Sequence, residues 1–359
     1  MPAVMWVEID IEVIVLGLYE ELLFLNEQDV LSLLTPADAI AAAEDTFLHI
    51  GLGDITVGEM ALMYVDKEKK NNFHSMPAIL HHKHAAGVKW IDTYANPIPG
   101  YPFSHGSLVL LSDTHTGSPI AIVGATNITT MRTAGGHGVV QAKHLCNPDP
   151  AVLTVIGCGA QAKAGIREFL THFSSLKQIR LYNRSRAPMM QVKQELSDRV
   201  EVVLCDSPSE AVKDSNLILM SSGAYQPLVT LDMIRPGTTI IGIEGFRDLD
   251  PRIGKRAEKW YLGYKKPDAY ILKSPNLNPG GFLADQDVFG DMTELLTGRI
   301  LGREREDEVI VSTHMGMGAH DVNCAVMVYE RARQKGMGQM LVLSNTAVIQ
   351  QRIVSGEII

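Results

Sequence analysis

The sequence has few cysteines and no pair of them in metal-binding or redox spacing. Its four cysteines lie far apart and form no CxxC motif: Cys146, Cys158, Cys205 and Cys324. Neither a zinc ribbon nor a disulfide framework is therefore predicted, and a reducing cytoplasm is the expected compartment. Cys158 lies within a glycine turn and is interpreted as a small filler, because no activating base stands beside it in the sequence.

Positive charge and long apolar runs are also missing. The net charge is −9, so the electrostatic attraction that dominates nucleic-acid binding is absent and no nucleic-acid partner is predicted. The first 25 residues contain Glu8, Asp10 and Glu12 but no Lys or Arg, which is not the pattern of a signal peptide. No stretch approaches the roughly 20 apolar residues of a membrane helix, and no membrane association is expected.

What remains is the composition of a folded protein with room for two domains. The chain has 359 residues, 46% of them apolar, which is enough for a sizeable buried core. From about residue 149 to 313, apolar strand-like runs alternate with helical segments, a pattern that predicts a parallel, doubly wound sheet. From 55 to 111, short strand-like runs are separated by turns, which indicates a mostly antiparallel sheet.

A glycine turn after an apolar strand is the most informative motif. The strand at 152–156 leads into Gly157-Cys158-Gly159 and then into a helix-like segment. In a dinucleotide site Gly157 would allow the tight turn, Gly159 would let the backbone approach a pyrophosphate, and Ala162 would let helix and strand pack closely. The helix N-terminus would offer free N–H groups to the phosphates.

A basic turn follows at the position that normally contacts the adenosine ribose. It reads Asn183-Arg184-Ser185-Arg186 and contains no carboxylate. An acidic residue there would bind the ribose 2′-hydroxyl of NAD(H), whereas arginines and a serine suit a 2′-phosphate. NADP(H) is therefore favoured over NAD(H), and the alternative to both is a solvated basic turn with no ligand.

These patterns predict an α/β fold with a Rossmann-type doubly wound parallel sheet over residues 147–320. Residues 1–146 and 321–359 would form a second, α+β domain, because the last predicted helix, 321–335, lies outside the parallel pattern. The strands expected in the parallel sheet are 152–156, 179–182, 200–204, 217–222 and 238–243.

Three residues are candidates for chemistry. Lys89 lies on a predicted strand, where a solvated lysine is the commoner alternative to a catalytic one. Arg132 lies among small residues in the predicted helix 129–145, where a guanidinium needs an anion or acceptor nearby. Glu244 follows the predicted strand 238–243, at the edge where ligands bind in open α/β sheets, although exposed glutamates are common at such places. The run from His81 to His84 has no regular ligand spacing, and no metal is predicted.

Together these residues resemble the ornithine cyclodeaminase and mu-crystallin family. This family includes cyclodeaminases, archaeal alanine dehydrogenases and NADPH-dependent ketimine reductases. The matching motifs, between about residues 26 and 340, are Met76-Pro77-Ala78, Gly87-Val88-Lys89, His105-Gly106, Thr116-Gly117-Ser118-Pro119, Thr129 to Ala134, Gly157-Cys158-Gly159-Ala160-Gln161, Asp248-Leu249-Asp250-Pro251, Asp291 to Arg303, and Asp321.

The resemblance implies both a domain arrangement and site residues. The two chain ends would form a substrate-binding and dimerisation domain, so a homodimer is expected. Lys89 and Arg132 would hold the carboxylate of an imino or amino acid, with His74 helping to shape the substrate pocket. The residues that would line the nucleotide are Ser104, Arg132, Thr133, Ala160, Gln161, Asn183, Arg184, Ser221 and His314.

Two departures from the cyclodeaminases favour a reductase. Cyclodeaminases keep an arginine in the strand that here reads Glu59-Met60-Ala61-Leu62, and an aspartate in a loop where Glu244 is now the nearest carboxylate. We therefore expect an NADPH-dependent reductase of imines of 2-oxo acids, with Glu244 as proton donor. The alternatives are an ornithine or lysine cyclodeaminase with bound NAD, and a non-catalytic NADPH-dependent binding protein.

Overall fold

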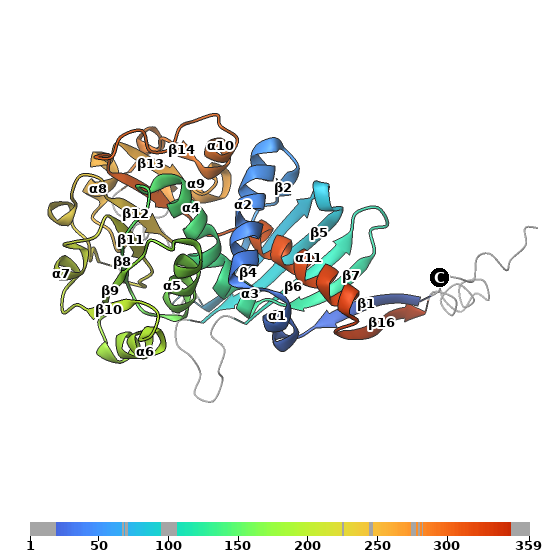
Figure 1. Cartoon of the computed structure of the whole chain (residues 1–359). Coiled ribbons are helices and arrows are strands. Elements are labelled where there is room, and N and C mark those ends of the chain that lie inside the picture. The colour runs from blue at the N-terminus through green and yellow to red at the C-terminus, as the bar shows by residue number, and fades with distance from the viewer. Residues whose placement is uncertain are drawn as a thin grey trace, which may run out of the picture.

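A computed structural model describes residues 19–66, 68, 71–94, 106–224, 226–243, 247–273, 278, 281 and 283–345. Two sheets of eight strands each dominate the molecule. In Figure 1 they lie side by side, with helices α2 (Pro36–Leu52) and α11 (Gly318–Lys335) on one face of the first sheet and α2 nearer the second. Within the described residues no helix has the length and apolar character to cross a membrane.

The second sheet confirms the predicted parallel pattern. Its strand order is β10-β9-β8-β11-β12-β15-β13-β14, and every neighbouring pair is parallel. The strands are β8 (Val152–Ile156), β9 (Gln178–Tyr182), β10 (Glu201–Leu204), β11 (Leu217–Met220), β12 (Thr239–Gly242), β13 (Lys259–Leu262), β14 (Gly290–Asp291) and β15 (Ile310–Thr313). The helices between them are α5 (Ala160–His172), α6 (Arg186–Leu196), α7 (Pro208–Val212), α8 (Pro251–Arg256), α9 (Lys265–Lys273) and α10 (Met292–Leu296). The chain order reverses between β8 and β11, which is where such sheets bind ligands.

The first sheet joins the two ends of the described chain. Its order is β16-β1-β7-β6-β5-β4-β2, with β3 paired to β4, and its pairs are antiparallel except for β1 with β7. The strands are β1 (Tyr19–Leu25), β2 (Ile55–Val57), β3 (Ala61–Asp66), β4 (Asn71–Leu80), β5 (Ala85–Thr93), β6 (Ser107–Asp113), β7 (Pro119–Gly124) and β16 (Gln339–Asn345). The mostly antiparallel sheet predicted from the turns is therefore confirmed.

Local signals set the limits of the long helices. Thr35 caps α2, since its hydroxyl accepts the Asp38 N–H at 3.3 Å and its own N–H donates to the Asp38 carboxylate at 2.8 Å. The helix ends at Gly53, whose φ of +89° suits glycine. Arg331 of α11 donates to the same Asp38 at 2.6 Å, which ties the short helix α1 (Glu27–Leu33) and α2 to the end of the chain.

The predicted helix over 129–145 is longer and less regular than expected. It consists of α3 (Thr126–Thr130), a π-helical turn η3 (Met131–His137) and α4 (Gly138–Leu145). The wide turn fits against α2 and α5 because its glycines allow close approach: a Cβ on Gly136 would lie 3.0 Å from the Ala39 carbonyl oxygen. π-helical turns are rare in proteins, and those that occur often lie at functional sites. This one carries Arg132.

Candidate active site

The centre of the site is a buried cluster of three charged side chains from different elements. Lys89 of β5 donates from Nζ to Asp321 Oδ1 of α11 at 2.7 Å, and Arg132 of η3 donates from Nε to the same oxygen at 3.1 Å. Thr129 Oγ1 lies 3.4 Å from that oxygen. The alternative of a solvated Lys89 is wrong, because the lysine is completely buried. We call Lys89, Arg132 and Asp321 the clamp.

The clamp carries one more positive charge than negative charge. Burial first, and repulsion by Arg132 second, lower the pKa of Lys89 to about 8, while Asp321 opposes this shift. Lys89 is therefore still a cation at neutral pH. Arg132 Nη1 and Asp321 Oδ2 are buried without a hydrogen-bond partner, and a guanidinium nitrogen in that state is expected to meet a ligand oxygen.

The clamp opens into a cavity of about 680 Å³. His74 lines this cavity together with Lys89 and Arg132, so the structure brings the three predicted substrate residues together. Gly316 lets the chain pass close to the clamp, since a Cβ there would lie 2.3 Å from Arg132 Nη1. Further lining residues are the apolar or aromatic Val57, Met60, Leu62, Tyr64, Met76, Ile91 and Met315, among others, and the charged Glu59, Arg247, Lys266 and Asp268. A small organic acid with a partly apolar side chain fits this lining.

The glycine turn has the geometry that a pyrophosphate site requires. Gly157 has φ +98°, and a Cβ there would lie 2.3 Å from the Ser221 carbonyl oxygen, so only glycine fits. Gly159 is the N-cap of α5, and a Cβ on it would meet nothing within 4 Å. Ala162 is buried beneath the turn. The turn therefore presents open backbone at a helix N-terminus, beside the point where the strand order reverses.

The basic turn is exposed and only partly engaged. Asn183 Oδ1 accepts the Cys158 N–H at 3.2 Å, which links this turn to the glycine turn. Arg186 pairs with Asp206 at 2.8 Å. Arg184 and Ser185 are exposed, and neither side chain has a described hydrogen-bond partner. Arg184 is thus the arginine with its guanidinium available to a 2′-phosphate.

The other predicted nucleotide residues lie around these two turns or on η3. Ala160 and Gln161 open α5, and Gln161 Oε1 is buried without a partner. Ser221 follows β11 beside the glycine turn, whereas the Thr133 hydroxyl donates to the Thr129 carbonyl oxygen within the helix. Ser104 and Glu244 lie outside the described residues. Contact of the nucleotide candidates with a nucleotide stays a prediction, and so does the role of Glu244 as proton donor.

His314 has other partners in the structure. Its ring is fully buried, with Nδ1 2.7 Å from Asp268 Oδ2 and Nε2 3.2 Å from His320 Nε2. Its predicted contact with the nucleotide is therefore without support from the described geometry and stays a prediction. No sequence pattern assigned a role to Asp268, His320 or Asp321. A signal was available for two of them, since His320-Asp321 interrupts an otherwise small and apolar start of α11.

Of the histidine run at 81–84, His82 stacks on His49 of α2 beside Asp45. The His49 and His82 rings are parallel, with centroids 3.9 Å apart, and both face Asp45. Lone pairs in the planes of parallel rings do not converge on one ion, and Lys83 Nζ already lies 3.0 Å from the Asp45 carboxylate.

Burial raises the pKa of the Cys158 thiol to about 12, in keeping with its interpretation as a filler.

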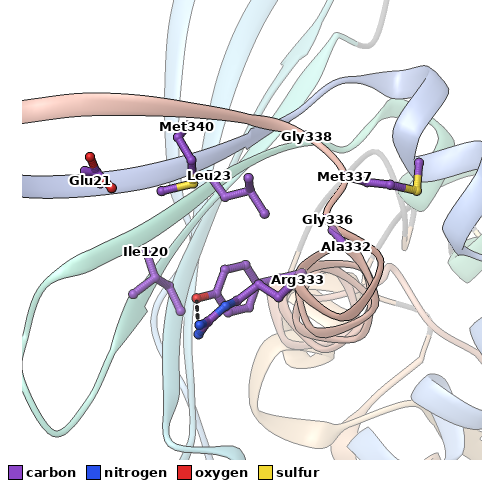
Figure 2. Close-up of a pocket in the computed structure, with 10 residues that line it drawn as sticks. Glu21, Leu23, Ile120, Ala332, Arg333, Gly336, Met337, Gly338 and Met340 are labelled. Carbon is purple, nitrogen blue, oxygen red and sulfur yellow. Dashed lines mark hydrogen bonds between the residues drawn. The ribbon is translucent and has the colours of Figure 1, made fainter.

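A second cavity, of about 510 Å³, lies between β1, β7 and the end of α11 (Figure 2). Leu23, Ile120 and Met340 form its apolar walls, and Arg333 reaches across it above Tyr329. Its charged side chains are exposed to solvent. It therefore has the character of a surface groove, in contrast to the buried charges of the clamp.

Comparison with known proteins agrees with this geometry. The N-((2S)-2-amino-2-carboxyethyl)-L-glutamate dehydrogenase of Staphylococcus aureus is 27% identical over 273 residues, which cover 74% of this chain and 81% of that protein. An archaeal alanine dehydrogenase dimer with bound NAD superimposes with a TM-score of 0.81 at 25% identity, covering 90% of this chain and all of that one. The Thermococcus litoralis Δ1-pyrroline-2-carboxylate reductase in complex with NADH and L-proline superimposes with a TM-score of 0.79 at 25% identity. The match covers 89% of this chain and 99% of that one.

A family model matches residues 20–336, a span that contains the clamp, the glycine turn and the basic turn. The motifs that carried the resemblance all lie within the matched span. The chain therefore belongs to the ornithine cyclodeaminase/mu-crystallin family.

Proposed function

We propose that the protein is a nicotinamide-dependent reductase of imines of 2-oxo acids, which in reverse oxidises the corresponding amino acids. The observation that carries this proposal is the buried clamp with its excess positive charge, open to a cavity and mounted on a helical turn packed against α5. The relatives support it, since their names are those of amino-acid dehydrogenases and of an imine reductase.

The clamp would bind the substrate through its carboxylate. Lys89 and Arg132 come from two different elements and would both contact the substrate carboxylate. Asp321 holds both cations in place. Two fixed contacts to a carboxylate orient the neighbouring carbon, which lowers the entropic cost of reaching the transition state. Because the cations are buried, their attraction for the carboxylate is stronger than that of surface cations.

The residues of the glycine turn fit a nicotinamide dinucleotide. Gly157, Gly159 and the N-terminus of α5 would hold its pyrophosphate. When bound, the nicotinamide supplies or accepts the hydride. Gly165 of α5 packs directly on η3, since a Cβ there would lie 2.7 Å from the Ala134 Cβ. Nucleotide and clamp thus rest on adjoining helices.

The preferred cofactor in this proposal is NADP(H). Arg184 is exposed and without a described partner, while Arg186 is held by Asp206. A guanidinium at this place supports binding of a 2′-phosphate. Glu244, which follows β12 in the sequence, stays our candidate proton donor, and Ser104 a candidate nucleotide contact.

The biological unit we propose is a homodimer. Along β6 the burial alternates, and the exposed face carries Leu108 and Leu110 beside Trp90 of β5. Exposed apolar patches of this kind mark association surfaces. The alanine dehydrogenase structure that this chain resembles is a dimer.

The function is tested by nicotinamide absorbance with NADPH and NADH in parallel. The substrates are cyclic imino acids and mixtures of 2-oxo acids with ammonia or methylamine, and ornithine is assayed separately for ammonia release. Oxidation of NADPH by an imine is the expected result. Ammonia from ornithine together with no imine reduction would move the protein to the cyclodeaminases.

The cofactor preference is tested with Arg184→Ala. We expect the KM for NADPH to rise about tenfold or more, as for the loss of one charge-assisted hydrogen bond, and the KM for NADH to change less than twofold. Arg199→Ala, an exposed arginine of the same sheet region, is the matched control. Equal effects of Arg184→Ala on both cofactors would contradict the preference for NADP(H).

A further inference from the structure

Three histidines lie fully buried together where α11 begins, beside the clamp. His314 Nδ1 lies 2.7 Å from Asp268 Oδ2, and His314 Nε2 lies 3.2 Å from His320 Nε2. The His137 ring stands 4.6 Å from the His314 ring, centroid to centroid. Phe47 of α2 packs on the edge of His320 at 4.8 Å. The proposed reaction assigns no task to these imidazoles.

The hydrogen bonds determine which nitrogens carry protons. The Asp268 carboxylate accepts the Tyr264 and Met315 N–H groups at 3.0 and 3.2 Å, so it is an acceptor and His314 donates Nδ1–H to it. His314 Nε2 then accepts from His320 Nε2–H. The remaining lone pair of His320 is on Nδ1, which is buried without a partner. A proton taken up by His320 would bind at this nitrogen.

The charges around this chain of groups come from every element packed on it. In the free protein, burial, the neighbouring His314 and the cations Arg132 and Lys89 hold the pKa of His320 well below its usual range. The charged and titratable groups facing it are Asp268 of α9, His137 and Arg132 of η3, Lys89 of β5, and Asp321 and Cys324 of α11. Two cations of the clamp thus oppose a proton on His320.

A carboxylate in the clamp would remove the part of this opposition that comes from Lys89 and Arg132. It adds one negative charge beside Lys89 and Arg132 and so cancels their repulsion of a positive imidazole. We propose that the chain Asp268–His314–His320 is a buried proton acceptor that takes up a proton when a substrate carboxylate occupies the clamp. This inference rests on the proposed function, because it requires an anion between Lys89 and Arg132.

The stored proton has a place in the reaction. When a proton binds His320 Nδ1, the Nε2 proton of His320 can pass to His314, whose positive charge then lies against Asp268 at 2.7 Å. Reduction of a neutral C=N bond takes one hydride at carbon and one proton at nitrogen. A proton acquired at binding therefore equals the one that the nitrogen takes up, with Glu244 as the candidate for its delivery, and oxidation of the amine returns it.

The test measures proton uptake on ligand binding. Pyruvate serves as the carboxylate probe, and calorimetry with the full chain between pH 6 and 7 compares buffers of different ionisation enthalpy. We expect up to one proton taken up per pyruvate bound, and a Kd that rises with pH by up to about tenfold per unit. Lys89, with its pKa of about 8, is about 90% protonated at pH 7 and more so at pH 6, so it contributes about 0.1 proton or less.

His320→Gln tests the chain Asp268–His314–His320 while leaving the three clamp residues unchanged. Glutamine keeps an N–H donor for His314 but cannot take a proton. Pyruvate should still bind, without proton uptake and with a Kd independent of pH from 6 to 7. His84→Gln, at an exposed position, should behave as the unmodified protein.

Pyruvate binding without proton uptake by the unmodified protein would overturn the proposal and leave the proposed function intact; this result needs no variant to fold. Proton uptake that persists in a folded His320→Gln protein would also overturn it. Failure of pyruvate to bind at all would instead overturn the clamp, and this inference with it.

Discussion

Two groups of cations in the molecule are our candidates for binding ligand anions, and they are built in opposite ways. In the clamp, the side chains of Lys89 and Arg132 are only 1% and 6% exposed and share one internal carboxylate. In the basic turn, Arg184 is exposed and Arg186 is 62% exposed in its pair with Asp206. Water solvates the second group, so its parts act independently. In the clamp, Asp321 and not water is the partner of both cations, so a change to one of the three charges affects the other two.

Removal of Asp321 should produce the largest effect. Asp321→Ala leaves two buried cations without their counter-charge, which is expected to lower the free energy of unfolding by about 3–5 kcal/mol. Urea unfolding followed by circular dichroism measures this loss. A variant as stable as the unmodified protein would show that another group balances Lys89 and Arg132.

Removal of Lys89 should separate binding from stability. Lys89→Met keeps most of the side-chain volume and leaves Arg132 paired with Asp321, so we expect a small change in stability. The carboxylate loses one buried charged contact, worth about 2–3 kcal/mol, so kcat/KM for the imine should fall by about 100-fold. Unchanged kcat/KM would show that Lys89 does not bind the substrate carboxylate, whereas no turnover by the unmodified protein would favour a non-catalytic binding protein.

A buried carboxyl without a cation extends the comparison. Glu168 of α5 lies against Gly135 of η3, and burial raises its pKa from 4.5 to about 9. The folded protein therefore favours protonated Glu168, and this contribution to stability is fully present below pH 4.5. As the pH rises towards 9 it is lost, and the free energy of unfolding falls by up to about 1.4 kcal/mol per pH unit. Glu168→Gln should flatten this fall, so that the variant gains stability relative to the unmodified protein between pH 5 and pH 8.

Unfolding free energies at the two pH values measure the effect of Glu168→Gln. Glu195→Gln, which alters a surface pair with Arg167, is the matched control and should keep the unmodified slope. Parallel pH profiles for Glu168→Gln and the unmodified protein would show that Glu168 is ionised in the folded state.

Salt concentration should change ligand binding at the basic turn more than at the clamp. This difference is smaller than the effects of the substitutions above. Exposed charges are screened over about 10 Å at 0.1 M salt and about 3 Å at 1 M, and buried charges much less. The KM for NADPH should therefore rise several-fold between these concentrations, while the Kd for pyruvate should change less than twofold. Equal salt dependence would indicate that solvent reaches the clamp.

The smallest effect is expected from the exposed pair. Asp206→Ala removes the partner of Arg186, but surface pairs contribute about 0.5 kcal/mol or less. Urea unfolding under the conditions used for Asp321→Ala makes the contrast direct. A loss close to that of Asp321→Ala would remove the distinction between the two groups.

Much of the fold was predictable because its signals are local. The strands β8, β9 and β12 begin within a residue of their predicted positions, since β-branched runs bounded by turn residues specify a strand without help from distant chain. The single helix predicted over 129–145 was only partly right. Its π-helical turn depends on the fit of Gly135 and Gly136 against α5 and α2, which no local pattern reveals.

The site was predictable in its members and not in its contacts. Lys89 and Arg132 were found as candidates, but the sequence left a solvated lysine open because its partner Asp321 stands 232 residues away. The chain of Asp268, His314 and His320 was missed for the same reason, since Asp268 and His314 are 46 residues apart.

The sequence by itself therefore determined the parallel sheet, the glycine turn and the charge of the basic turn, because each depends on neighbouring residues. Only the tertiary structure decided that Lys89 is buried, that one carboxylate holds two cations, and that three histidines lie behind them. Burial and charge pairing are properties of the packed molecule, and they arise where β5, η3 and α11 meet.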